Sequence, residues 1–124
     1  MPEMPEIMDG IWLPVDAELS GQRLPEGSLD KLELVLSDGN YTLKVSGTTV
    51  DQGVIELFPE STPKAMKISG SDGPNKGRNV PAIYHLDAET LTICYNLSGA
   101  ATPADFKTEG GTQLYLVTYN RKSN

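Results

Sequence analysis

Hydrophobic and polar residues alternate with a period of two along much of this chain, which is the pattern of half-buried β-strands. The segment 31–46 shows it most clearly, because its large apolar residues occupy alternate positions on both sides of Asp38-Gly39-Asn40, a strong turn signal. A hairpin folded at this turn pairs apolar residues directly, namely Leu32 with Val45, Leu34 with Leu43 and Leu36 with Tyr41. All six then share one face, and a shift of one residue would expose one set to water.

A second hairpin is predicted over residues 82–95, around a tight turn at 87–90. Its apolar residues pair in the same way, namely Ala82 with Tyr95, Tyr84 with Ile93 and Leu86 with Leu91. Because successive side chains of a strand point to opposite faces, the other face then carries Ile83, His85, Thr92 and Cys94. We expect the first set to face a core and the second set to lie on the outside.

Single strands are predicted at 11–18, 50–58, 64–70 and 112–120. Pro14 interrupts the first of them, and because proline cannot donate a hydrogen bond to a neighbouring strand, we expect a sheet edge or a bulge there. The one helical feature is the segment 25–32, in which Ser28 could cap a single turn.

These segments together predict an all-β fold, a small up-and-down antiparallel barrel of about eight strands with at most one short helix. A meander of eight strands can close on itself, which removes its exposed edges. The length of 124 residues fits one domain. We place that domain at 10–121, after a flexible N-terminal segment at 1–9 and before a short C-terminal tail at 122–124.

Six of the inward-facing residues of the two hairpins are the candidate ligand-binding residues. They are Leu34, Tyr41, Leu43, Tyr84, Ile93 and Tyr95. A barrel of eight strands is either filled by side chains or holds one small ligand, and interior tyrosine hydroxyls need one another, water or a ligand as partners. The short strands favour a filled or nearly filled interior over a cavity. Residues 96–111 form the longest irregular stretch and are the candidate gate of one barrel mouth.

The charge of the chain, −7 overall, disfavours nucleic acid as a partner, because phosphates require basic clusters. The charge is uneven: residues 1–60 carry a net −9 (twelve acidic and three basic residues), and residues 61–124 carry a net +2 (five and seven). A local basic stretch consists of Lys64, Lys67, Lys76 and Arg78. It is either ordinary solvated charge or a contact surface for an acidic partner. No apolar run is long enough to span a membrane.

Cys94 is the single cysteine, so no internal disulfide can form, and residues 1–9 lack the features of a signal peptide. We therefore expect a cytoplasmic location. His85 is the single histidine, which leaves too few ligands for a metal site, and no cofactor is expected. The segment 72–77 lacks the Gly-Lys-Ser/Thr ending of a phosphate-binding loop and is better explained as a wide turn.

Four segments of the chain resemble the small, uncharacterised bacterial lipocalin-like domains of the Planctomycetes type. The matching segments are Gly10-Ile11-Trp12, residues 53–57 with 63–66, residues 72–77 with 83–87, and residues 91–95 with 102–106. The resemblance extends from about residue 10 to residue 121 and departs at Thr102, where relatives tend to have arginine. It implies a lipocalin-like (calycin-like) barrel. The family carries no settled biochemical activity, so the resemblance implies a fold and no reaction.

The resemblance also implies a structural role for Trp12 and Arg121. In lipocalin-like barrels, a tryptophan at the start of the first strand closes one end, and a basic side chain of the last strand stacks on it. Such a cation–π contact contributes about 0.5–2 kcal/mol. We expect Arg121 to stack on Trp12 in this chain.

Three functions are compatible with these observations. The first is a non-enzymatic, monomeric binding module for a small apolar or amphipathic molecule. The second is a protein-interaction or structural domain with a filled core. The third is a hydrolase-like or redox activity of Cys94 with His85, which the second hairpin places diagonally across from each other. Against this third function, both residues could simply lie on the outer face or in a small satellite pocket.

Overall fold

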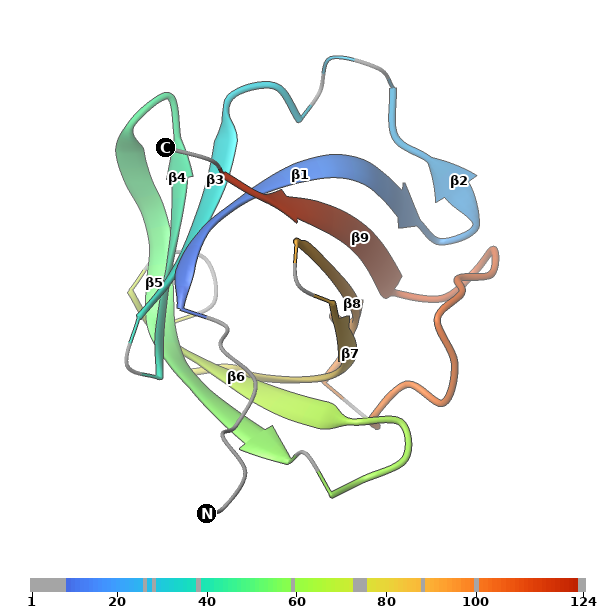
Figure 1. The fold of residues 1–124 in the computed structure, drawn as a ribbon. Helices are drawn as coiled ribbons and strands as arrows, with labels where there is room; N and C mark the ends of the chain where they lie inside the picture. The colour runs from blue at the N-terminus through green and yellow to red at the C-terminus, as the bar shows by residue number, and fades with distance from the viewer. Residues whose placement is uncertain are drawn as a thin grey trace.

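The computed structural model describes residues 9–25, 27, 29–37, 39–58, 60–72, 76–87, 89–99 and 101–122. Nine antiparallel strands are found in this part of the chain, and no helix (Figure 1). The strands are β1 (Gly10–Leu19), β2 (Gln22–Arg23), β3 (Leu32–Ser37), β4 (Asn40–Val45), β5 (Thr48–Phe58), β6 (Ala65–Asp72), β7 (Asn79–Leu86), β8 (Thr90–Asn96) and β9 (Leu114–Arg121).

Sequential pairing of β3 to β9, together with the pairing of β1 to both β3 and β9, closes an eight-stranded barrel. Figure 1 shows this ring of strands with β1 and β9 side by side. The predicted all-β, up-and-down barrel is therefore confirmed. The short strand β2 is an addition that the sequence pattern did not indicate, and it pairs with the end of β1.

The registers of the two predicted hairpins are confirmed. In β3 and β4, Leu34 pairs with Leu43 and Leu36 with Tyr41; in β7 and β8, Tyr84 pairs with Ile93. Among the described residues of the segment 25–32 there is no helix; the Asp30 amide donates a hydrogen bond to the Gly27 carbonyl and the Leu32 amide donates one to the Leu29 carbonyl, so this segment forms single turns. Ser28, the expected cap, lies outside the described residues.

Pro14 is accommodated by a bulge in the middle of β1. The register of β1 against β9 shifts between Pro14 and Asp16, and the extra residue, Val15, is 52% exposed. The bulge was one of the two expectations for this position. The other, a sheet edge, also holds locally, because β1 pairs with β3 only through residues 10–12 and at Pro14 is paired with β9 alone. A bulge bends the strand and increases its twist, which suits a closed barrel wall.

The core occupies the inside of the barrel and is closed at the end where β1 begins and β9 ends. Trp12 is completely buried there. The Arg121 guanidinium lies 4.3 Å from the centre of the Trp12 ring, and its Nη1 donates a hydrogen bond of 2.9 Å to the Asp9 carbonyl. Along the described chain, no helix has the length and apolar character to cross a membrane.

Candidate functional site

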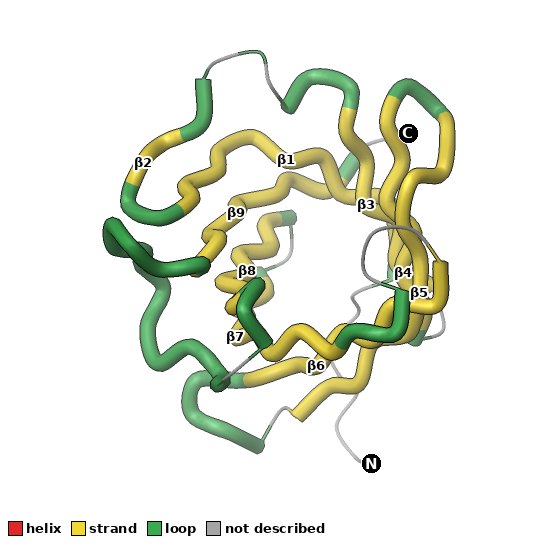
Figure 2. Tube along the Cα trace, turned by 180° about the vertical axis from the view of Figure 1, so that it is seen from behind, coloured by secondary structure: helices red, strands yellow, loops and turns green. Residues whose placement is uncertain are grey.

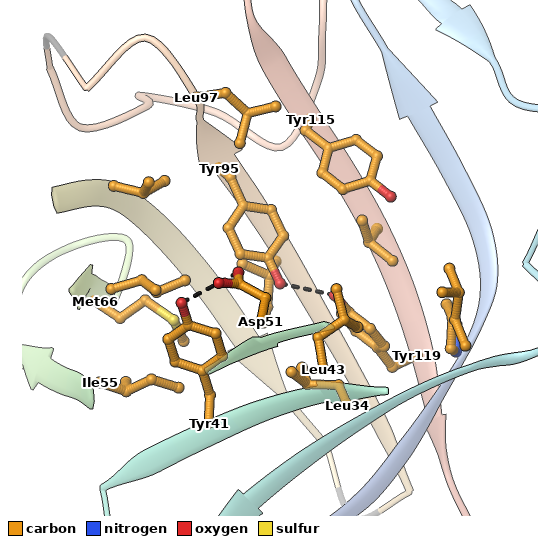
Figure 3. Close-up of a pocket in the computed structure, with 16 residues that line it drawn as sticks. Leu34, Tyr41, Leu43, Asp51, Ile55, Met66, Tyr95, Leu97, Tyr115 and Tyr119 are labelled. Carbon is orange, nitrogen blue, oxygen red and sulfur yellow. Dashed lines mark hydrogen bonds between the residues drawn. The ribbon is translucent and has the colours of Figure 1, made fainter. Parts of the chain in front are cut away.

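A cavity of about 140 Å³ lies inside the barrel (Figure 3). All eight strands of the barrel, β1 and β3 to β9, contribute inward-facing side chains to its wall, and Leu97 follows β8. Its lining consists of Pro14, Leu32, Leu34, Tyr41, Leu43, Asp51, Ile55, Met66, Ile68, Val80, Ile93, Tyr95, Leu97, Tyr115, Val117 and Tyr119. The wall is therefore mainly apolar, with four phenols and one carboxyl group.

Five of the six predicted ligand-binding residues line this cavity. They are Leu34, Tyr41, Leu43, Ile93 and Tyr95. The sixth, Tyr84, is 2% exposed and belongs to the packed core, but it is not part of the cavity wall. The strict alternation of the two hairpins explains why these side chains share one interior.

The expectation of a filled interior is correct only for one end of the barrel. Around Trp12, Leu36 and Leu91 the side chains are buried and close-packed. Toward the other end, Leu32, Leu97 and Tyr115 line the cavity and are only half-buried. The cavity is thus closed on the Trp12 side and approaches solvent on the opposite side.

Asp51 is the acidic residue of the cavity wall. Its side chain points inward from β5, and the residue is only 6% exposed. The Tyr41 hydroxyl donates a hydrogen bond of 3.2 Å to the Asp51 Oδ2 atom, as Figure 3 shows. A buried carboxylate is costly unless hydrogen bonds compensate for its lost hydration. The hydrogen bond from Tyr41 therefore offsets part of the free-energy cost of burying Asp51.

Gly53 permits the contact between Tyr41 and Asp51. Gly53 lies directly opposite Tyr41 in the β4–β5 pair. A Cβ atom at position 53 would lie 2.1 Å from the Ser69 carbonyl oxygen and 2.8 Å from Tyr41 Cε2, both closer than atoms can approach. Because position 53 carries no side chain, the Tyr41 ring can pack against β5 at this position, and its hydroxyl reaches the Asp51 carboxylate two residues away.

The remaining polar groups of the wall are phenols from β8 and β9. The hydroxyls of Tyr95 and Tyr119 form a hydrogen bond of 2.7 Å (Figure 3), and the rings of Tyr95 and Tyr115 stack with centres 5.7 Å apart. Burial raises the pKa of Tyr95, Tyr115 and Tyr119 above that of a free tyrosine. These side chains therefore stay neutral at physiological pH and act as hydrogen-bonding groups.

Three polar residues of the wall were not among the predicted site residues, namely Asp51, Tyr115 and Tyr119. The two tyrosines were detectable, because Tyr115, Val117 and Tyr119 alternate along one face of the last strand. Asp51 gave no such signal, since an acidic residue in a strand is usually solvent-facing. Its inward direction follows a register shift between Leu43 and Lys44 in the β4–β5 pair.

The loop between β8 and β9, expected to gate the barrel, lies mainly on the outer wall. Only Leu97 of this loop lines the cavity among the described residues. Phe106 packs against Cys94 on the outside, and Thr108 donates a hydrogen bond of 2.6 Å to Glu18 Oε1 in β1. Figure 2 shows the loop running outside the ring of strands. Its described centre therefore covers the wall, and the idea that it gates the mouth is wrong for that part.

Cys94 and His85 are both on the outer face, in different environments. Cys94 is fully buried in a satellite cluster with Ala65, Ile83, Phe106 and Leu116. Burial is the main cause that raises the pKa of its thiol. His85 is exposed, and its Nε2 lies 3.5 Å from Asp87 Oδ1. A covered thiol and an exposed imidazole do not form a nucleophile–base pair of the kind that catalysis requires.

The basic stretch is dispersed over the outer surface. Lys67 lies 3.7 Å from Glu56, Lys64 and Lys76 are exposed, and Arg78 donates a hydrogen bond to the Leu97 carbonyl. Residues 73–75 of the wide turn lie outside the described residues. Within the part of the chain that the structure describes, no three His, Cys, Asp or Glu side chains are grouped so that they could hold a metal ion.

Comparison of the chain with protein-family models, with curated proteins and with solved structures finds no match. The resemblance to the bacterial lipocalin-like domains therefore stays a prediction, and the function is inferred from the cavity itself.

Proposed function

We propose that this chain is a non-enzymatic binding module that takes one small, mainly apolar molecule into the barrel. The observation that carries the proposal is the cavity of about 140 Å³, whose wall combines aliphatic side chains with a few polar groups. This combination is the usual composition of a ligand site, because apolar surface provides affinity and a few hydrogen-bonding groups provide orientation.

The size of the cavity restricts the ligand. An engineered cavity of about 150 Å³, lined by apolar side chains, binds benzene. Pockets for drug-sized ligands are larger, at about 300–1,000 Å³. The cavity of this barrel, at about 140 Å³, fits a single ring or a short branched chain, and a long acyl chain would have to extend out of it.

Toluene is a suitable probe, because it is one ring with no polar group. We expect toluene to shift the NMR signals of residues in the cavity wall and to raise the midpoint of thermal unfolding, since it binds the folded state alone. Val80, which lines the cavity and is 2% exposed, is the position to fill. The Val80→Phe variant should lose toluene binding because its ring occupies the space.

The matched control is Val54→Phe, the same change at a residue that is 51% exposed on the outside of β5. This variant should bind toluene like the unmodified protein. Circular dichroism establishes that both variants are folded, and Val80→Leu provides a smaller filling step if Val80→Phe is not. Saturating toluene that leaves the cavity signals of the unmodified protein unchanged would overturn the proposal.

A further inference from the structure

We propose that the ligand of this cavity is a small protonated amine with an apolar body, whose ammonium group is bound by Asp51. This inference rests on the proposed function and adds the chemical class of the ligand. It follows from three properties of the cavity wall: the position of a carboxylate, the charge balance of the lining, and the aromatic side chains that surround the same space.

The Asp51 carboxylate is placed inside the barrel where a bound molecule would meet it. The residue is 6% exposed and forms part of the cavity wall between Leu43 and Ile55. Its hydrogen bond from Tyr41 uses Oδ2. A carboxylate has about four lone-pair sites for hydrogen bonds, so it has the capacity to accept donors from a ligand in addition to the tyrosine. An ammonium group carries such donors and no acceptor.

The charge balance of the lining favours a cation. Of the sixteen described residues that form the wall, Asp51 is the one acidic residue, and none is Lys, Arg or His. A hydrogen bond between an ammonium and a carboxylate is shorter and stronger than one between neutral groups, and water exclusion strengthens it further. A carboxylate ligand of the fatty-acid type would instead place a second negative charge beside Asp51.

The aromatic side chains of the wall also suit a cation. Tyr41, Tyr95, Tyr115 and Tyr119 all line the same cavity, and Figure 3 shows Tyr41 and Tyr95 on either side of the Asp51 side chain. The face of an aromatic ring attracts a cation, and cages of such rings recognise ammonium groups. An apolar body on the amine would occupy the aliphatic part of the wall, formed by residues such as Ile68 and Val117.

Three ligands of one ring and nearly one shape test the inference by titration calorimetry at neutral pH: benzylamine, benzyl alcohol and benzoate. We expect benzylamine to bind about tenfold more tightly than benzyl alcohol, because a charge-assisted hydrogen bond is stronger than a neutral one. Benzoate should give no measurable binding. These measurements need only the unmodified protein.

The Asp51→Asn variant should lose the preference for benzylamine and retain the binding of benzyl alcohol. The matched control is Asp87→Asn, which removes an acid that is 68% exposed on the outer surface and should leave the preference unchanged. If Asp51→Asn does not fold, Asp51→Ser, which also removes the carboxylate, replaces it and should lose the preference in the same way.

The outcomes separate this inference from the proposed function. If benzyl alcohol or toluene binds the unmodified protein as tightly as benzylamine, the amine is the wrong ligand class and the cavity is still a binding site. If Asp51→Asn keeps the full preference for benzylamine, the assignment of Asp51 is wrong. If neither the amine nor the neutral ligands bind, both proposals are overturned.

Discussion

Gly53 is the residue whose lack of a side chain positions the polar part of the cavity. Directly opposite Tyr41, it lets β5 and β6 approach and lets the tyrosine ring lie across the strand. The ring then directs its hydroxyl to Asp51. Cross-strand pairs of an aromatic residue with glycine are a known way to stabilise sheets at positions where glycine alone would weaken them.

The Gly53→Ala substitution should therefore lower the free energy of unfolding by about 3 kcal/mol, since the added methyl group meets the Ser69 carbonyl and the Tyr41 ring. Urea unfolding measures this loss. Gly110→Ala is the control, because the nearest atom to its Cβ, the Ser20 carbonyl oxygen, is 3.8 Å away. Equal stability of the two variants would contradict the close approach at Gly53.

The same three residues show what sequence reasoning could and could not find. Tyr41 was placed inside the barrel because its hairpin alternates strictly around a short turn, and the observed pairs are the predicted ones. Asp51 was not found, because polarity is the signal that separates inside from outside, and a buried acid gives the opposite signal. Its position became visible only once the long-range partners of β5 were known.

Among the elements, the loop between β8 and β9 shows how a long irregular segment is held on a barrel. Thr108 forms hydrogen bonds with two positions of the hairpin made by β1 and β2: its Oγ1 accepts a hydrogen bond of 2.8 Å from the Gly21 amide and donates one to the Glu18 carboxylate. Ser20 donates a hydrogen bond to the Thr112 carbonyl close by. The loop therefore fastens the turn between β1 and β2 to the wall, a role that its composition did not indicate.

Thr108→Val should release this loop, because valine has the same shape but neither hydrogen bond. We expect cleavage within residues 101–113 by a broad-specificity protease to become about tenfold faster, the effect of losing about 1.4 kcal/mol of local stability. Mass spectrometry identifies the cleavage sites. Thr102→Val, at an exposed position of the same loop, should cleave at the original rate. Unchanged cleavage of Thr108→Val would mean that other contacts hold the loop.

The bulges in β1 and β5 show how far the sequence pattern predicts irregularities in the strands. Pro14 indicated the bulge in β1, because proline cannot donate a hydrogen bond to a neighbouring strand. The second lies between Leu43 and Lys44 in the register of β4 with β5, where the sequence contains no proline or glycine. Alternation alone left the inner face of β5 undecided, because an extra residue reverses the inside and outside positions that follow it.

At the scale of the whole molecule, the interior joins groups from strands that are distant in the sequence. Tyr41 and Asp51 come from the first half of the chain, and Tyr95, Tyr115 and Tyr119 from the second half. The cavity exists only because closure of the barrel brings both halves around one space. The order of the strands could be predicted from the alternation along each strand. The enclosed volume could not, because it depends on how the side chains of all the strands pack.

The buried tyrosines should make the folded protein sensitive to alkali. Below pH 10.0, the ordinary pKa of a tyrosine, folded and unfolded chains both keep these protons, so stability does not depend on them. Above it, the unfolded chain releases protons that folded Tyr95 and Tyr119 retain, because burial raises the pKa of both side chains. The free energy of unfolding should then fall with rising pH, by up to about 1.4 kcal/mol per pH unit for each tyrosine.

Urea unfolding from neutral pH to about pH 11 measures this slope. Tyr119→Phe removes one of the two groups and should reduce the slope by the contribution of one tyrosine. A free energy of unfolding that stays constant as the pH rises past about 10 would show that these hydroxyls ionise as easily in the folded protein as in the unfolded chain.

The pairing of β1 with β9 also determines when this chain can fold during its synthesis. Trp12 and Arg121 are direct neighbours across that pair, so nearly the whole described chain separates two strands that must meet. Until β9 has left the ribosome, the free edges of β1 and β8 stay open to pairing with other chains. Contacts between such distant residues also form slowly. We therefore expect the nascent chain to be most prone to aggregation before its ninth strand is released.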